Sequence, residues 1–152
     1  MHILLTFDVE LSPDFHWRHP DRLRDNVQRS YYGGGAGRWG LEDQLKLLSN
    51  YGLKAVFFVE ALSACVTGPE QLLDVCALIR RYNQDIQLHT HPEWLELRAG
   101  NQEKPSRLMA DLSEAQQSDA IAVGLSNLAA AGCKNIIAHR AGGFGANFDT
   151  LR

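Results

Sequence analysis

The strongest constraint on the fold is the alternation of four short apolar runs with longer segments of helical pattern. Each run has the length and the Ile, Val, Leu and Phe content of a strand that is buried on both faces. The expected strands are residues 2–9, 54–60, 85–91 and 134–140. The expected helices are residues 41–51, 69–82 and 113–131, and a further helix is expected to begin near Asn147.

Strands that alternate with helices are typical of α/β proteins with a parallel sheet and right-handed crossovers. The signals at the helix ends agree with this assignment. Ser113 and Gln116 have the spacing of a capping box, and Gly52 and Gly132 follow the ends of two expected helices. The 152 residues suit a single domain, residues 1–152. We therefore predict an α/β fold built from parallel β/α repeats.

Every expected strand ends in ionisable residues. The carboxyl ends of parallel strands meet at one edge of the sheet, and active sites of α/β proteins lie there. The residues concerned are Asp8, Glu10, Glu60, His89, His91, His139 and Arg140. We therefore expect an active site at this edge.

The pair His89 and His91 is the most specific of these signals. Because the side chains of a strand alternate, both imidazoles point to the same side. Two imidazoles and one carboxylate, with a position left open to water, form a catalytic zinc set. Asp8 and Glu10 also share one side, so one of them can bind the metal while the other accepts a proton. The alternative is a polar strand end without a metal.

Arg140 follows the fourth strand in the segment AHRAGGFGAN. Its guanidinium could hold a catalytic carboxylate in place and keep it ionised, or it could form an ion pair that only stabilises the sheet edge. Asp8 follows an entirely apolar run that we expect to be buried, which argues against a plain surface acid at this strand end.

Two long connections, residues 11–38 and 93–112, show no regular pattern, and we expect irregular loops beside the site. Their aromatic residues could form a sugar-stacking platform or could simply pin the loops. These aromatic residues are Tyr31, Tyr32, Trp39 and Trp94. Residues 35–40 fit a GxGxxG pattern, but no strand precedes them directly, so a flexible loop is expected and not a dinucleotide site.

Composition argues against several classes of partner. The net charge is −3 and no basic stripe is present, which argues against nucleic acid, and no apolar run is long enough to span a membrane. The N-terminus lacks the features of a signal peptide. The three cysteines lie far apart in apolar segments, so we expect reduced thiols in a cytoplasmic protein.

Four segments, LLTFDVE, KAVFFVEAL, IQLHTHPEW and HRAGGFGAN, resemble in order and spacing the first motifs of the polysaccharide deacetylases. This family is the NodB-homology domain, or carbohydrate esterase family 4, and the segments are most similar to its branch from bacterial surface-glycan biosynthesis. The resemblance extends from residue 3 to the end of the chain. It implies a distorted (β/α) barrel that binds one divalent metal, usually zinc, and removes acetyl groups from N-acetylated sugars.

On the matching positions, the resemblance implies that Glu10, His89 and His91 bind the metal. It further implies that Asp8 is the catalytic base and that Arg140 orients it. The chain departs from the family at each of these motifs.

The first family motif commonly reads T-F-D-D, whereas Val9 follows Asp8 here and Glu10 takes the ligand position, as in the D-x-D variant. The family usually places its two histidines four residues apart, and this chain places them two apart. In the third motif, Ala141 and Gly142 replace a turn that contains proline.

Family domains are longer than this chain, and their later motifs supply the rest of the barrel and a general-acid histidine. We therefore expect about half a barrel, truncated at its C-terminus, whose open sheet edge could pair with a second copy. His16 or His139 could donate the proton instead. The rival interpretation is a non-catalytic metal- or glycan-binding module, or a structural fragment that assembles through the open edge.

Overall fold

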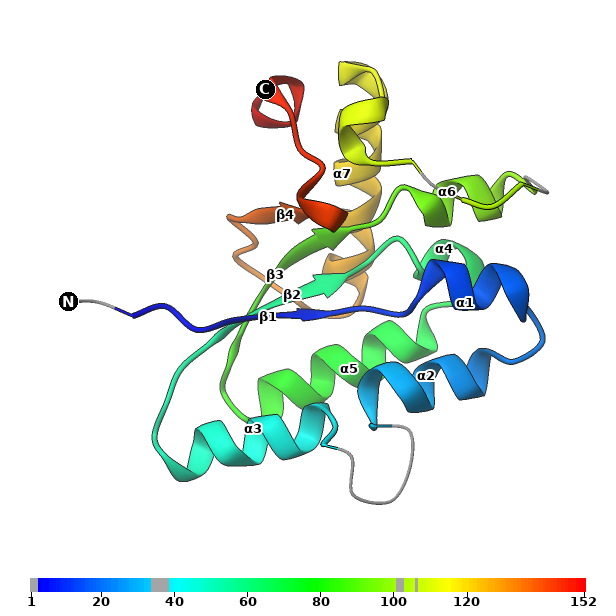
Figure 1. Cartoon of the computed structure of the whole chain (residues 1–152). Coiled ribbons are helices and arrows are strands. Elements are labelled where there is room, and N and C mark those ends of the chain that lie inside the picture. Colours follow the sequence, from blue (N-terminus) through cyan, green and yellow to red (C-terminus); the bar gives the residue numbers. More distant parts are fainter. Residues whose placement is uncertain (1–2, 34–38, 101–102, 106) are drawn as a thin grey trace.

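The computed structural model describes residues 3–33, 39–100, 103–105 and 107–152. Four parallel strands form a curved sheet, as the sequence predicts. The strands lie in chain order, so β1 and β4 are the outer strands and the sheet resembles half of a barrel (Figure 1). They are β1 (Thr6–Val9), β2 (Val56–Glu60), β3 (Asp85–Thr90) and β4 (His139–Ala141). The family-specific barrel and the pairing of two copies through an outer strand stay predictions.

The three expected helices are confirmed as α3 (Leu41–Asn50), α5 (Glu70–Arg81) and α7 (Glu114–Ala130). The capping box at the start of α7 is also confirmed: the Ser113 hydroxyl accepts the N–H of Gln116, and the Gln116 side chain accepts the N–H of Ser113. Gly132 follows this helix with a φ of 76°, a conformation that glycine adopts without strain.

In the part of the chain that the structure describes, the helices cover one face of the sheet and leave the other open. In Figure 1, α3 and α5 lie below β1 and β2, and α7 lies beside β3. A β-carbon at Gly124 in α7 would come within 4 Å of Leu88 and Thr90, so these strand residues face that helix. Because side chains alternate along a strand, His89 points to the open face.

The connection from residue 11 to 38 was predicted to be irregular, and this prediction is wrong. It contains α1 (Pro13–Arg18) and α2 (Leu23–Tyr31). The Ser12 hydroxyl caps α1 by accepting the N–H of Phe15 at 3.1 Å, and Pro13 occupies the first turn. Asn26 in α2 then bonds the backbone of Ser12 in both directions, so the two short helices hold each other. Residues 35–38 of the glycine-rich segment lie outside the described residues.

The second connection, residues 93–112, was also predicted wrongly as irregular. It contains α6 (Glu93–Arg98), which begins directly after Pro92, and the 3₁₀ turn η1 (Met109–Asp111). The remaining short elements are α4 (Ala64–Thr67), η2 (Gly142–Phe144) and η3 (Phe148–Leu151). The helix expected near Asn147 is therefore one 3₁₀ turn, capped by the Asn147 side chain.

Strand β4 has three residues, although residues 134–140 were expected to be extended throughout. The reason is visible at its start, where the buried Gln87 side chain accepts the N–H groups of both Ile137 and Ala138 at 2.8 Å. The Gln87 side chain thus takes the backbone N–H groups that a longer β4 would donate to β3, and regular pairing begins only at His139.

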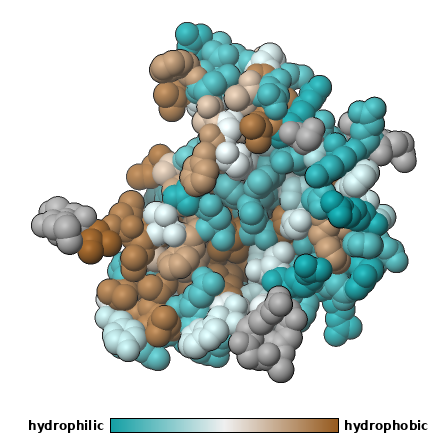
Figure 2. All heavy atoms as spheres, in the orientation of Figure 1, coloured by the Kyte–Doolittle hydropathy of each residue, from teal (hydrophilic) through white to brown (hydrophobic). Residues whose placement is uncertain are grey.

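Two of the aromatic residues considered for a sugar platform belong to the core. Trp94 and Tyr31 are 0% and 2% exposed, so these two residues anchor their segments in the core, which is the other alternative considered. Cys76 and Cys133 are free and buried, and Cys65 is free and partly buried. Figure 2 shows apolar side chains gathered on the side of the N-terminus, and a mostly hydrophilic surface around α1 and α6. Within the described residues, no helix has both the length and the apolar character needed to cross a bilayer.

Candidate metal centre

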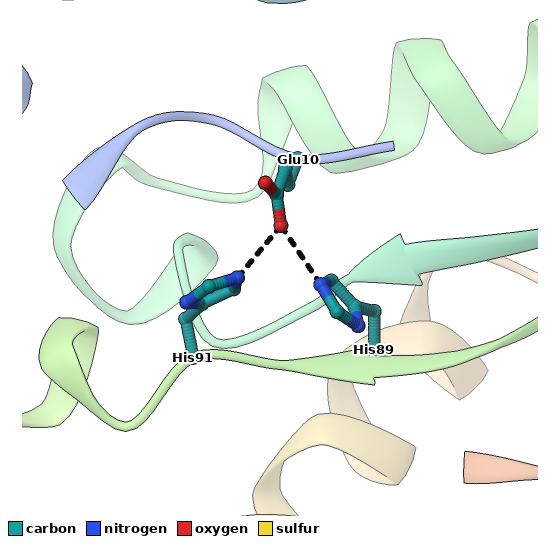
Figure 3. Close-up of side chains that lie close together, drawn as sticks. All are labelled: Glu10, His89 and His91. Carbon is teal, nitrogen blue, oxygen red and sulfur yellow. Dashed lines mark hydrogen bonds and ion pairs between the residues drawn. The ribbon is translucent and has the colours of Figure 1, made fainter. Parts of the chain in front are cut away.

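Three side chains converge at the carboxyl edge of the sheet (Figure 3). The Nε2 atoms of His89 and His91 lie 2.8 Å and 2.7 Å from the same oxygen of Glu10, Oε2. One ligand atom from each residue lies within 4.8 Å of the others, which is a spacing that could hold a metal ion. The structure therefore brings together the three residues that the sequence predicts as ligands.

The strands explain this convergence. His89 lies in β3 and His91 follows directly after it, so the alternation of the strand places both rings on the open face. The rings meet edge to face, with their centroids 5.0 Å apart. Glu10 lies one residue beyond β1, and the parallel register brings the end of β1 to the same edge as the end of β3.

The second nitrogen of each imidazole has its own partner. Nδ1 of His89 lies 2.8 Å from the backbone oxygen of Arg140, and Nδ1 of His91 lies 3.3 Å from the Glu93 carboxylate. A proton on each Nδ1 leaves both Nε2 atoms with lone pairs directed toward Glu10. Two imidazole nitrogens and one carboxylate oxygen match the ligands that zinc takes in catalytic sites. The residues present therefore fit a divalent metal.

Without a metal, the three groups interact through protons. Burial alone would raise the pKa of Glu10, but the hydrogen bonds with His89 and His91 lower it to about 2. Burial would lower the pKa of His91, yet its contacts with Glu10 and Glu93 raise it to about 10. At neutral pH the metal-free site therefore contains an ionised Glu10 beside a protonated His91.

Asp8 and Arg140 form a second interaction on the open face. One guanidinium nitrogen lies 2.5 Å from Asp8 Oδ1 and the other donates to Thr6 Oγ1 at 3.0 Å. The guanidinium lies 4.0 Å from the centre of the Phe58 ring, so this side chain crosses the sheet from β4 to β1. The Asp8 side chain is 34% exposed, and Ile3 and Leu4 in the run before it are both 74% exposed, so the expectation of a buried run is wrong at its start. The open face leaves its carboxylate accessible.

These residues border one small depression of about 70 Å³. Its lining consists of Asp8, Glu10, His89, His91, Arg140, Ala141, Gly143 and Phe144. The predicted base, its arginine and the three predicted ligands thus share one pocket. Phe144 is 83% exposed at its rim and has a φ of 55°.

Two residues expected at this edge are used elsewhere. Glu60 is fully buried, and its carboxylate accepts the N–H groups of Leu62 at 2.8 Å, Ser63 at 2.7 Å and His91 at 3.3 Å. Burial raises the pKa of this carboxyl, and the N–H groups of Ser63 and Leu62 partly oppose the rise. Glu60 therefore orders the backbone beside the site and does not face the pocket.

His139 points to the side of the sheet that packs on α7, where its Nε2 lies 2.8 Å from the Thr90 hydroxyl. Burial, with a smaller contribution from His89, lowers its pKa to about 4. The other histidine considered as a proton donor, His16, is buried with its ring against Trp94, and burial lowers its pKa as well. Because both pKa values are lowered, both histidines would be neutral near pH 7. Neither histidine borders the pocket.

Sequence reasoning missed Glu93. The available signal was its position four residues after His89, where the resembling family usually has its second histidine. The short helix after Pro92 was not expected, and without it the orientation of the Glu93 side chain could not be inferred.

Comparison of the sequence with protein-family models found no match, and comparisons with curated proteins and with solved structures found no significant match either. The fold and the site geometry, together with the motif resemblance, are therefore the basis for assigning a function.

Proposed function

We propose that this chain is a metal-dependent carbohydrate N-deacetylase of the polysaccharide deacetylase type, which acts on amino sugars of a cell-surface polysaccharide or its precursor. The observation that carries the proposal is the convergence of His89 Nε2 and His91 Nε2 on one oxygen of Glu10. The distorted barrel of that family, of which this sheet would form about half, is part of the same proposal.

Glu10, His89 and His91 would hold the ion, and zinc is the metal that their nitrogen and oxygen atoms favour. When bound, zinc acts as a Lewis acid toward water and toward the carbonyl oxygen of an acetamido group. Asp8 borders the same pocket but does not belong to the group of residues that could bind the metal.

In this proposal Asp8 accepts a proton from the attacking water. Arg140 holds its carboxylate through Oδ1 and is itself held by Thr6 and Phe58. The guanidinium thereby fixes the orientation of the carboxylate, as a base that acts on one bound water requires. In this scheme the water oxygen bonds to the acetamido carbon, Asp8 passes the accepted proton to the sugar nitrogen, and the C–N bond then breaks, which gives acetate and the free amine.

The proposal is tested by zinc calorimetry on the 152-residue chain and by acetate release from N-acetylglucosamine oligomers. We expect stoichiometric zinc binding, its loss in the His89→Ala/His91→Ala double variant, and its retention in His19→Ala, a matched histidine outside the pocket. Absence of zinc binding by the unaltered chain would refute the metal site. Tight zinc binding without acetate release would refute the enzymatic proposal and favour a non-catalytic metal- or glycan-binding module.

A further inference from the structure

Glu93 contacts the ring nitrogen of His91 that faces away from the other predicted ligands. Its Oε2 lies 3.3 Å from His91 Nδ1, and both side chains are 15% exposed. This oxygen is buried and has no hydrogen-bond partner within the described residues, so its contact with His91 is an ion pair at 3.3 Å. The imidazole of His91 is therefore the polar group that this oxygen faces.

The local sequence explains why Glu93 reaches this position. His91 ends the extended segment, Pro92 begins the turn, and Glu93 is the first residue of α6. The side chains of a helix tilt toward its N-terminus, which directs Glu93 back toward His91. Pro92 thus joins the end of β3 to the start of α6. The strand end directs His91 into the pocket, and the helix start directs the Glu93 carboxylate at the other side of the same ring.

His91 requires such a partner more than His89 does. Nδ1 of His89 donates to the backbone oxygen of Arg140 at 2.8 Å, inside the sheet. His91 lies beyond β3, where no neighbouring strand offers an equivalent carbonyl in the register. Its backbone N–H is fixed by Glu60, but that bond does not set the rotation of the ring.

We propose that Glu93 is a positioning residue that holds the proton of His91 on Nδ1 and thereby directs Nε2 toward the metal. This inference rests on the proposed metal site and identifies a residue outside its ligand set. A carboxylate that accepts from the outer nitrogen of a ligating histidine fixes the ring and raises the basicity of the ligand. Loss of such a partner typically weakens metal affinity by roughly 10- to 100-fold.

The test compares zinc affinities of Glu93→Gln, Glu93→Ala and Glu96→Gln by competition with a chelating dye. Glu96 is the matched control, because it lies in the same helix, has a similarly buried side chain at 16% exposure and pairs with Arg107. We expect affinity to fall by about tenfold in Glu93→Gln, which keeps an acceptor oxygen, and by up to about 100-fold in Glu93→Ala. Glu96→Gln should bind zinc as the unaltered chain does.

A second measurement separates positioning from a general effect on folding. Nitrogen-15 NMR of the histidine rings reports the Nδ1 proton of His91, with and without zinc. We expect this proton to exchange faster with water in Glu93→Ala than in Glu96→Gln, with the other histidines unchanged. Equal zinc affinities for the Glu93 variants and the unaltered chain would overturn the inference while leaving the deacetylase proposal intact.

The two proposals can also fail in the opposite order. If the unaltered chain bound no zinc, the deacetylase proposal would fall, and the inference would be judged on the metal-free protein. An Nδ1 proton of His91 that exchanges equally fast in Glu93→Ala and in the unaltered chain would then refute the role of Glu93.

Discussion

The ring of His91 lies against the backbone of Gly142. A β-carbon built at position 142 would fall 2.5 Å from Cε1 of this ring and 2.6 Å from both of its nitrogens. Such contacts are closer than non-bonded atoms tolerate, so glycine is required here by the imidazole and not by backbone conformation. The loop that follows β4 therefore limits where His91 can lie.

We expect Gly142→Ala to displace His91 and to weaken zinc binding by at least about tenfold, with a stability cost of about 1–3 kcal/mol for overpacking. Zinc calorimetry and urea unfolding measure the two effects separately. The control is Gly124→Ala, whose β-carbon would come 2.8 Å from Leu88 in the core and would not touch His91. Unchanged zinc affinity in Gly142→Ala would contradict the assignment of His91 as a ligand.

Replacement of Asp8 by Asn should separate metal binding from catalysis. Asn keeps the shape of the side chain but cannot accept the proton of water, so we expect acetate release to fall by roughly 10²- to 10⁴-fold. Zinc affinity should stay within about threefold, because Asp8 is not in the ligand set. Asp14→Asn, in α1, is the surface control. An Asp8→Asn variant with full activity would exclude Asp8 as the base.

Metal binding should release a proton in the neutral range. His91, whose pKa is raised to about 10 in the metal-free chain, is protonated at pH 7 and has to lose one proton to bind an ion. Affinity should therefore rise by up to about tenfold per pH unit until pH reaches about 10. Calorimetry in buffers of different ionisation enthalpy measures the proton count, and we expect about one per ion. Zero protons released at pH 7 would contradict this protonation state.

The same two shifts set the pH dependence of stability in the metal-free chain. The pKa of His91 is raised from 6.5, so its contribution is complete below pH 6.5 and is lost as pH rises through about 10. The pKa of Glu10 is lowered from 4.5, so its contribution is complete above pH 4.5 and is lost as pH falls toward about 2. The pair should stabilise the fold most between these ordinary values. Unfolding midpoints across pH, compared with Glu10→Gln, check this expectation.

Glu60→Gln should destabilise the fold although it replaces only one carboxyl oxygen by an amide nitrogen. The Glu60 oxygens accept three N–H groups, and an amide in their place would direct its own N–H donors at one of them. We expect a loss of about 1–3 kcal/mol in the free energy of unfolding. Glu114→Gln, on the surface of α7, should change it by less than about 0.5 kcal/mol. Equal stabilities of the two variants would argue against the role assigned to Glu60.

Local periodicity was sufficient to predict the parallel sheet and the shared side of His89 and His91, whereas the choice of Glu10 over Asp8 as the third candidate ligand came from the motif resemblance. Alternation in β3 determines that His89 and His91 share a side, and parallel strands place Glu10 at the same edge. Periodicity does not determine which way a strand-end carboxylate turns. Glu60 has the same sequence signature as Glu10, yet the tight turn after β2 captures it with backbone N–H groups.

The short helices were missed for a related reason. Ser12 and Pro13 carry a helix-start signal, but a helix of six residues is marginal without tertiary contacts. Those contacts come from Asn26, which lies 14 residues further along the chain. The shortening of β4 likewise depends on the Gln87 side chain, 50 residues away from Ile137. Pairings of this range leave no periodic pattern in the sequence.

Arg140 joins the two outermost strands of the sheet, because it belongs to β4 and bonds Asp8 and Thr6 of β1 across the open face. Its side chain thus bridges the concave side of the curved sheet. A change in the curvature of the sheet changes the distance between β1 and β4, and the Asp8 carboxylate, which is bound to Arg140, moves with it. The curvature of the sheet and the position of the Asp8 carboxylate are therefore coupled, and we expect a core substitution that alters the curvature to move this proposed base even when it lies far from the pocket.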